Sequence, residues 1–299
     1  MNSDAAGIEL GGTKALVTVG SSAERHAPAR RIPTTTPEVT LAGIIEALGE
    51  LRDEGWNFDA IGIASFGPAG LDRTRSDYGH ILATPKAGWS NVDIVGTLQK
   101  RFHVPIAFET DVNGAAYGEG LWGASRDCAQ HAYITVGTGV GVGICVDGRP
   151  LHGLTHPESG HLLLRRHRSD TFAGSCPCHG DCVEGLISGP ALWKRLGRDP
   201  GEVAPSHPVW SLVGDYLGQL CAVLTLVASP RRIVIGGGVG ARPEVLQFTS
   251  ESLRRCLNGY ISHEALAPDS TNYLVAPGLG PWSGLMGALA LGLATATRS

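Results

Sequence analysis

Two stretches of the chain run from aliphatic residues into a glycine-rich break and back into aliphatic residues. The first predicts strands over residues 8–10 and 15–19, and the second predicts strands over residues 133–136 and 142–146. A short glycine turn between two such runs is typical of a β-hairpin. Because the same arrangement recurs roughly 125 residues later, we expect a duplicated α/β domain.

The rest of the pattern alternates helical and strand periodicity. Apolar residues at helical spacing, or continuous apolar runs that end in glycine, predict helices and strands in the segments 40–55, 60–70, 105–124, 208–229, 231–240 and 280–296. Alternating strands and helices predict a mostly parallel or mixed sheet with covered faces. We therefore expect an N-terminal domain over residues 1–112, completed by a closing helix at 283–299, and a C-terminal domain over 113–282.

Composition narrows the class of ligand and the compartment. Of 299 residues, 24 are basic and 28 acidic, and the formal charge of −4 offers no attraction to nucleic acid or an anionic membrane. The start "MNSDAAGIEL" has an acid where a signal peptide has Lys or Arg, and the longest apolar stretch, near "LMGALALGLATA", is too short to span a bilayer. We expect a cytoplasmic protein with a small soluble substrate.

Three glycine loops follow predicted strands and offer backbone amides to an anion. They are "LGGTK", "VGTGVG" and "IGGGVG", and the candidate phosphate-binding residues in them are Gly11, Gly12, Thr13, Lys14, Gly137, Thr138, Gly139, Gly236, Gly237 and Gly238. Glycine lets a phosphate approach the backbone closely, although each loop alone is more often a plain turn. Three loops at strand ends, where open α/β sheets bind ligands, together favour a nucleotide.

A compact group of cysteine and histidine lies in "CPCHGDC". The chain has seven cysteines, an odd number that argues against a disulfide framework in a reducing compartment. Cys176, His179 and Cys182 have the short spacing of zinc ligands, and His161 lies upstream. A redox pair would require a CxxC motif in a thioredoxin-like unit, which the sequence does not contain. Zinc is therefore favoured over a redox site or an accident of composition.

Asp111 lies where a predicted strand gives way to a helix, in "FETDVNG". From local sequence alone, an Asp at this position is most simply the N-cap of the helix. Phosphoryl transfer to a hydroxyl also needs a carboxylate that orients the attacking oxygen and accepts its proton. The local sequence leaves both roles open.

Together these residues resemble the two-domain actin/hexokinase/Hsp70-like ATPase fold, with its ribonuclease H-like duplicated domains, and within it the ROK family of bacterial sugar kinases and repressors. The resemblance covers residues 7 to 292, and "TPKAGW" with "CPCHGDC" is typical of the fructokinase branch. It implies that the two domains clamp ATP with Mg²⁺, the first two glycine loops on the phosphates and Gly236–Gly238 near the adenosine. Glu9 is a departure, because the first hairpin of the superfamily usually carries Asp near the Mg²⁺.

The resemblance also implies roles for the acceptor side. Asp111 corresponds to the general base, and the sugar-binding set comprises Asn113, Glu158, His161 and Glu184. In the fructokinase register the zinc ligands are His161, Cys176, His179 and Cys182, with Cys178 as a spare thiol or alternative ligand. Because protein atoms would fill all four coordination positions, the zinc is expected to be structural.

The predicted function is transfer of the ATP γ-phosphoryl group to the C6 hydroxyl of fructose. The same chemistry on mannose or glucose is an alternative. These sugars differ in the orientation of their hydroxyl groups, and the sequence does not show the side-chain geometry that distinguishes them. A sugar-sensing repressor is disfavoured, since repressors of this family carry a helix-turn-helix ahead of the first hairpin, which here begins within the first dozen residues. The family resemblance further implies a homodimer without a nucleic-acid or membrane partner.

Overall fold

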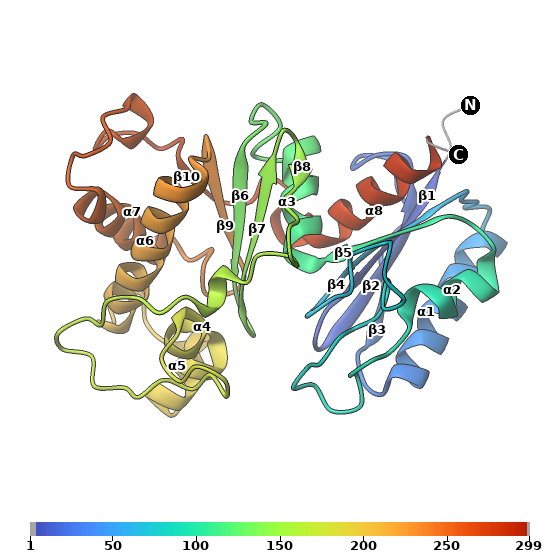
Figure 1. Cartoon of the computed structure of the whole chain (residues 1–299), viewed down its shortest axis with the longest axis horizontal. Helices are drawn as coiled ribbons and strands as arrows, with labels where there is room; N and C mark the ends of the chain where they lie inside the picture. The colour runs from blue at the N-terminus through green and yellow to red at the C-terminus, as the bar shows by residue number, and fades with distance from the viewer. Residues whose placement is uncertain (1–3, 298–299) are drawn as a thin grey trace. The chain divides into compact units, whose positions relative to one another are not determined.

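The computed structural model describes residues 4–297, which form two compact units (Figure 1). Unit 1 comprises residues up to Gly123, Pro150–His156 and the segment from Trp282 onward, whereas unit 2 comprises Ala124–Arg149 and Pro157–Pro281. Residues 1–3 and 298–299, which the predicted first domain includes, lie outside the described residues.

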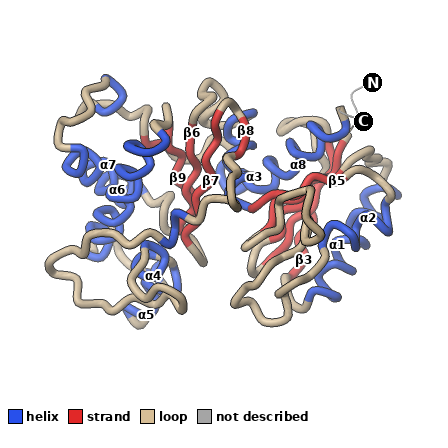
Figure 2. The backbone as a smooth tube through the Cα atoms, viewed as in Figure 1, coloured by secondary structure: helices blue, strands red, loops and turns tan. Residues whose placement is uncertain are grey.

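Unit 1 is built on a five-stranded mixed sheet (Figure 2). Its order is β3-β2-β1-β4-β5, and its strands are β1 (Ala5–Leu10), β2 (Lys14–Gly20), β3 (Arg30–Pro33), β4 (Ile61–Ser65) and β5 (Ile106–Thr110). The first three strands pair antiparallel, and β4 and β5 continue the sheet in parallel from β1. The predicted first hairpin is therefore present, with its turn at Gly11–Thr13.

Four helices cover the two faces of this sheet. Helices α1 (Pro37–Asp53) and α2 (Ile94–Phe102) pack on the face to which Ile8 and Leu10 point. Helices α3 (Asp111–Leu121) and α8 (Ser283–Ala296) cover the other face. Glycine permits the close approach there, because a Cβ at Gly62 of β4 would lie 1.9 Å from the Ala288 carbonyl oxygen.

Unit 2 repeats the same strand order. Its sheet runs β8-β7-β6-β9-β10, with β6 (His131–Val136), β7 (Val140–Val146), β8 (Arg149–Pro150), β9 (Arg232–Gly236) and β10 (Leu274–Val275). Strands β6 and β7 form the second antiparallel hairpin, and β9 pairs parallel to β6. Two units with one topology are what the repeated hairpin predicts for a duplicated domain.

The helices of unit 2 surround an apolar core that includes Trp210 and Tyr216. They are α4 (Val183–Ile187), α5 (Gly189–Leu196), α6 (Val209–Ala228) and α7 (Pro243–Leu257). Short 3-10 turns lie at Ser159–His161, Pro200–Glu202, Glu264–Leu266 and, where the chain passes from unit 2 to unit 1, Gly280–Trp282.

Helix α6 corrects the expectation about the longest apolar stretch. Within residues 4–297 it is the single helix whose length of 20 residues and composition would suit a membrane span, and it exceeds the "LMGALALGLATA" segment. About half of it, 56% of the apolar window, is buried inside the protein. A core helix satisfies the same length criterion, and α6 packs against α7 along its length.

The unit boundaries differ from the predicted division at residue 112 in two places. Helix α3 stays with unit 1 because it packs against α8, where a Cβ at Gly287 would lie 1.8 Å from the Gly114 carbonyl oxygen. The segment Pro150–His156 also belongs to unit 1, although the residues on both sides of it belong to unit 2. Both differences arise from contacts between residues far apart in the sequence.

Candidate functional site

The carboxyl ends of β1, β4 and β5 lie at the same edge of the unit 1 sheet. In the parallel register, Leu10, Ser65 and Thr110 are opposite one another. The first glycine turn and Asp111 therefore follow the sheet at the edge where open α/β sheets bind ligands.

Thr110, rather than Asp111, is the N-cap of α3. Its hydroxyl oxygen accepts a hydrogen bond from the Asn113 backbone amide at 3.3 Å, and Asp111 is the first residue of the helix. Asp111 is half-buried, and its Oδ1 atom is 2.8 Å from the Val112 amide. The N-cap role that local sequence suggests for Asp111 is therefore wrong, because threonine performs it. The carboxylate of Asp111 is not needed for capping.

Glu109 and His152 contact each other near the start of α3 and were not predicted. Glu109 is buried, and its Oε1 atom accepts hydrogen bonds from the Thr110 amide and from Asn113 Nδ2, both at 2.9 Å. Its Oε2 atom is 2.7 Å from His152 Nε2, and this hydrogen bond raises the pKa of His152. Glu109 thus orients the predicted sugar-binding Asn113, and its spacing of two from Asp111 was the available sequence signal.

The first glycine turn has an open face. A Cβ at Gly12 would meet no atom within 4 Å, so an anion can reach the backbone there. Lys14 is the first residue of β2, directly after the turn, and Glu9 lies on β1, one residue before the end of that strand. Burial, reinforced by repulsion from Asp111, raises the pKa of Glu9 to about 7, and Oε2 of Glu9 is buried without a hydrogen-bond partner.

We expect Glu9 to make the folding stability depend on pH. Between pH 4.5 and 7 the folded state binds more protons at Glu9 than the unfolded state does, so the unfolding free energy falls as the pH rises. The shift amounts to about 3 kcal/mol, which Glu9→Gln removes because the amide stays neutral. Urea unfolding at pH 5, 6, 7 and 8 should show a steeper decline for wild type than for Glu9→Gln. The exposed Glu24→Gln is the control, and parallel curves for wild type and Glu9→Gln would contradict the assignment.

The second glycine turn and the third glycine loop line one cavity of unit 2. Its volume is about 570 Å³, and Gly137, Thr138 and Gly238 contribute to its wall. A Cβ at Gly137 or Gly238 would meet nothing within 4 Å, so both backbones are open to a ligand. The structure thus brings together two of the three loops that the sequence singled out.

The same cavity has walls that the sequence did not predict. Trp193 on α5 is exposed, and Trp210 on α6 lies beneath the Arg242 guanidinium at 4.1 Å from the ring centre. An exposed indole beside a guanidinium suits a flat aromatic ring such as a nucleobase. Helical periodicity alone assigns both tryptophans to the core, so the sequence carried no specific signal for them.

The four predicted zinc ligands converge in unit 2. One ligand atom from each of His161, Cys176, His179 and Cys182 lies within 4.8 Å of the others. The Sγ atoms of Cys176 and Cys182 lie 3.7 and 3.5 Å from His161 Nδ1, and that of Cys176 lies 3.7 Å from His179 Nδ1. A tetrahedral zinc site with ordinary bond lengths has a sulfur-to-nitrogen edge of about 3.6 Å. The donor set therefore fits zinc.

Cys178 lies outside this cluster and is exposed, whereas Cys182 is fully buried. Burial raises the pKa of the Cys182 thiol to about 11, so a bound metal would have to displace its proton. Cys182 is also the N-cap of α4, and its sulfur accepts a hydrogen bond from the Gly185 amide at 3.5 Å.

Two contacts join the metal cluster to the second glycine turn. Glu184 Oε2, on α4, accepts a hydrogen bond from the Val140 amide at 3.0 Å. Gly160, beside the predicted ligand His161, packs so closely that a Cβ would lie 1.8 Å from the Val140 carbonyl oxygen. The predicted sugar ligands differ in exposure, since Glu158 is exposed and Glu184 is half-buried. Glu184 therefore supports the turn whatever else it binds.

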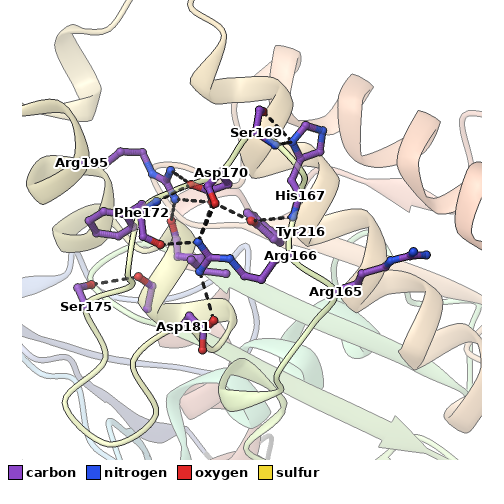
Figure 3. Close-up of polar contacts among 12 residues, drawn as sticks. Arg165, Arg166, His167, Ser169, Asp170, Phe172, Ser175, Asp181, Arg195 and Tyr216 are labelled. Atoms are coloured by element: carbon purple, nitrogen blue, oxygen red, sulfur yellow. Dashed lines mark hydrogen bonds and ion pairs between the residues drawn. The ribbon is translucent and has the colours of Figure 1, made fainter.

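A polar network holds the loop that precedes Cys176, one of the predicted zinc ligands (Figure 3). The Asp170 side chain is 1% exposed and receives hydrogen bonds from Arg195 at 2.5 and 3.1 Å and from the Tyr216 hydroxyl at 2.7 Å. Arg166 connects this network to Asp181, which directly precedes Cys182. Burial raises the pKa of Asp170, but the hydrogen bonds from Arg195 and Tyr216 outweigh it and lower the pKa to about 2.

We expect Asp170→Asn to destabilise unit 2 by about 3 kcal/mol at pH 7, because it leaves the Arg195 charge without its buried partner. Asp181→Asn is the matched control, because the Asp181 side chain is 44% exposed, and it should cost at most about 1 kcal/mol. Since the Asp170 pKa is lowered, its contribution is present above the unfolded value of 3.8 and is lost as the pH falls toward 2. Urea unfolding at pH 7 and pH 2.5 measures both effects. Equal losses for the two variants at pH 7 would contradict the anchoring role.

Comparison with known proteins identifies relatives over the whole chain. The sequence profile of the ROK family matches residues 5–295. The fructokinase of Zymomonas mobilis is 41% identical over 298 residues, which cover 97% of each chain. The crystal structure of a ROK hexokinase from Thermus thermophilus superposes with a TM-score of 0.78 at 27% identity, covering 99% of this chain and all of the other.

A third relative was solved with ligands. The ROK family glucokinase of Streptomyces griseus, in complex with glucose and AMPPNP, superposes with a TM-score of 0.73 at 26% identity and covers 97% of this chain and 99% of that one. These structures share the actin/hexokinase-like architecture of two related α/β units that the hairpin repeat predicts.

Proposed function

The chain belongs to the ROK family, and from that premise we propose that it is an ATP-dependent fructokinase. The reaction transfers the γ-phosphoryl group of ATP to the C6 hydroxyl of fructose and yields fructose 6-phosphate and ADP. The observation that carries the choice of fructose is the 41% identity to a fructokinase over nearly the full length of both chains.

Asp111 is the proposed general base. Its carboxylate accepts the proton of the C6 hydroxyl while the oxygen attacks the γ-phosphorus, the bond to the bridging oxygen of ADP breaks, and ADP leaves. Three observations support this role. Thr110 caps the helix in place of Asp111, and Glu109 accepts a hydrogen bond from Asn113. The strand register brings Asp111 to the same edge of the sheet as the first glycine turn. The amide of Asn113 is the proposed orienting group for the sugar.

The nucleotide is proposed to bind through the glycine loops. The open faces of Gly12 and Gly137 suit phosphate oxygens, and the cavity beside Trp193 suits the base. When bound with ATP, Mg²⁺ would balance the charge of the β- and γ-phosphates. The proposed ATP-binding residues are Gly11–Lys14 of unit 1 and, in unit 2, Gly137–Gly139 and Gly236–Gly238.

The zinc is proposed to be structural, because protein atoms supply four donors. It would hold α4 through Cys182. Helix α4 carries Glu184, which accepts a hydrogen bond from the Val140 amide beside the second glycine turn. Glu158, His161 and Glu184 are the proposed sugar ligands besides Asn113. A carboxylate can accept hydrogen bonds from two vicinal hydroxyls, which suits a hexose.

The test is ADP formation with Mg·ATP against fructose, mannose, glucose and N-acetylated hexosamines, run on zinc-loaded protein. We expect kcat/KM for fructose to exceed the others, and phosphorus NMR of the product to show the 6-phosphate. A preference for glucose or mannose would keep the kinase and overturn the substrate. No turnover of any sugar would overturn the function and favour a sugar-sensing protein.

The cellular setting remains a prediction. A formal net charge of −4 gives no support for a nucleic-acid or membrane partner. A cytoplasmic homodimer is the state that we expect, and light scattering of the purified protein would measure its mass.

A further inference from the structure

The "TPKAGW" loop brings a lysine to the first glycine turn. The ammonium Nζ of Lys86 donates a hydrogen bond to the Gly12 carbonyl oxygen at 2.6 Å, across 74 positions of sequence. Both residues belong to unit 1. This contact is not explained by the proposed roles of the turn or of Asp111.

The loop presents Lys86 from a fixed position. Trp89, three residues later, is fully buried, and its indole nitrogen donates to the Thr35 carbonyl oxygen at 2.8 Å. Its ring packs edge-on against Phe66 at 5.3 Å. The Ser90 hydroxyl closes the loop by bonding to both the amide and the carbonyl of Thr84, each at 3.2 Å. A loop with a buried anchor and an internal closure restricts where the Lys86 side chain can reach.

The contact completes the engagement of the turn's carbonyl groups. The Gly11 carbonyl accepts from the Thr34 hydroxyl at 2.8 Å, the Thr13 carbonyl from the Thr34 amide at 3.1 Å, and the Lys14 carbonyl from the Gly11 amide at 3.0 Å. With Gly12 bound to Lys86, all four carbonyl oxygens of Gly11–Lys14 have donors. Hydrogen-bond donors therefore compensate the carbonyl oxygens of the turn, while the space that a Cβ of Gly12 would occupy stays open.

The charge of Lys86 has no acidic partner. Among residues 4–297, no ion pair joins Lys86 to a carboxylate. An ammonium has three donors, and the contact of Lys86 with the Gly12 carbonyl uses one of them. A half-buried cation bound only to a neutral carbonyl is poorly compensated, and an anion at the turn would compensate it. With Lys14 at the start of β2 beside the same open glycine turn, this edge of the sheet favours a polyanionic ligand.

We propose that Lys86 is a further catalytic residue, whose ammonium contacts the terminal phosphoryl group of ATP while it tethers the first glycine turn. The inference rests on the proposed kinase function. A positive charge fixed beside the transferring group stabilises the charge that its oxygens carry in the transition state, and the anchored loop supplies that charge without reorganisation.

Three variants separate the charge from the tether. Lys86→Gln keeps a donor for the Gly12 carbonyl but removes the charge, Lys86→Arg keeps the charge, and the exposed Lys100→Met on α2 is the control for loss of a surface cation in the same unit. We expect Lys86→Gln to lower kcat on the order of 10²-fold to 10³-fold, with KM for fructose within about twofold of wild type. Lys86→Arg should recover most of kcat, and Lys100→Met should match wild type.

Nucleotide binding provides a readout that a purely structural role would not change. By calorimetry, Lys86→Gln should weaken a non-hydrolysable ATP analogue about tenfold while ADP binding stays within about twofold, because ADP lacks the terminal phosphoryl group. Equal losses for both nucleotides, or a kcat within twofold of wild type, would overturn the proposal. If Lys86→Gln fails to fold, Lys86→Arg is compared with wild type instead. Equal effects of Lys86→Arg on the binding of both nucleotides would indicate a purely structural tether and would overturn the proposal. A wild-type protein inert toward every hexose overturns the proposed function instead.

Discussion

Replacing Asp111 with asparagine is expected to lower kcat for fructose phosphorylation on the order of 10³-fold while leaving fructose binding nearly unchanged. Asparagine has the same size and can orient the hydroxyl, but it cannot accept the proton. Because Thr110 caps α3, the substitution leaves the capping hydrogen bond in place, and the melting temperature should stay close to that of wild type. A loss of turnover can therefore be attributed to chemistry and not to helix stability.

The measurement is steady-state kinetics together with fructose titration by calorimetry. Asp53→Asn, at the exposed end of α1, is the matched control for removal of one carboxylate from unit 1 and should leave kcat unchanged. Asp111→Asn has a second consequence. Because repulsion from Asp111 contributes to the raised pKa of Glu9, removing the Asp111 charge should lower that pKa. Retention of wild-type kcat by Asp111→Asn would eliminate it as the base.

Substitution of Cys182 by serine is expected to abolish zinc binding and to lower the melting temperature of unit 2 by about 10 °C. Serine is a good N-cap and a poor zinc ligand, so Cys182→Ser keeps the start of α4 and removes one of the four donors. The remaining His161, Cys176 and His179 would no longer enclose the ion. Loss of the ion should loosen α4, and with it the Glu184 contact to the second turn.

Metal analysis of the purified variants measures the effect directly, with one zinc per chain expected for wild type and none for Cys182→Ser. Cys178→Ser is the matched control, because Cys178 is exposed and lies outside the cluster. It should keep the zinc, the melting temperature and the activity. Zinc loss in Cys178→Ser with retention in Cys182→Ser would reverse the ligand assignment.

The effect on catalysis separates a structural zinc from a catalytic one. Cys182→Ser is expected to raise KM for fructose more than it lowers kcat, since Glu184 and His161 are the groups that the proposed zinc would hold. The Asp170→Asn variant gives an independent comparison, because it weakens the same loop from the side of Arg195 and Tyr216 without touching a ligand. If both variants raise KM in proportion to their loss of stability, the zinc acts through the loop.

Local sequence was sufficient for the elements that carry the site. Both hairpins, the helices α1, α6 and α8, and the strand-to-helix junction at Asp111 follow from apolar periodicity and glycine turns, which act within a few residues. The zinc cluster was recognisable for the same reason, since three of its ligands lie within seven positions. The family resemblance added His161 and the sugar-binding residues.

The tertiary structure decided what depends on distant contacts. Thr110 and Asp111 are both good caps, and only the folded helix shows that threonine takes the position. Glu109 meets His152 43 positions away, and Lys86 meets Gly12 74 positions away. The boundary after Gly123 and the return of Pro150–His156 to unit 1 likewise follow from packing of α3 on α8 and from the His152 contact.

The division has one physical reason. Hydrogen-bond periodicity and turn chemistry are properties of neighbouring residues, so the sequence by itself determined the hairpins, the duplicated α/β units and the zinc-type ligand spacing. The partners of Glu109, Lys86 and Asp170 are selected by how sheets and helices pack, which no short segment contains. The charges that surround Asp111 and the first glycine turn were therefore decided only when the chain had folded.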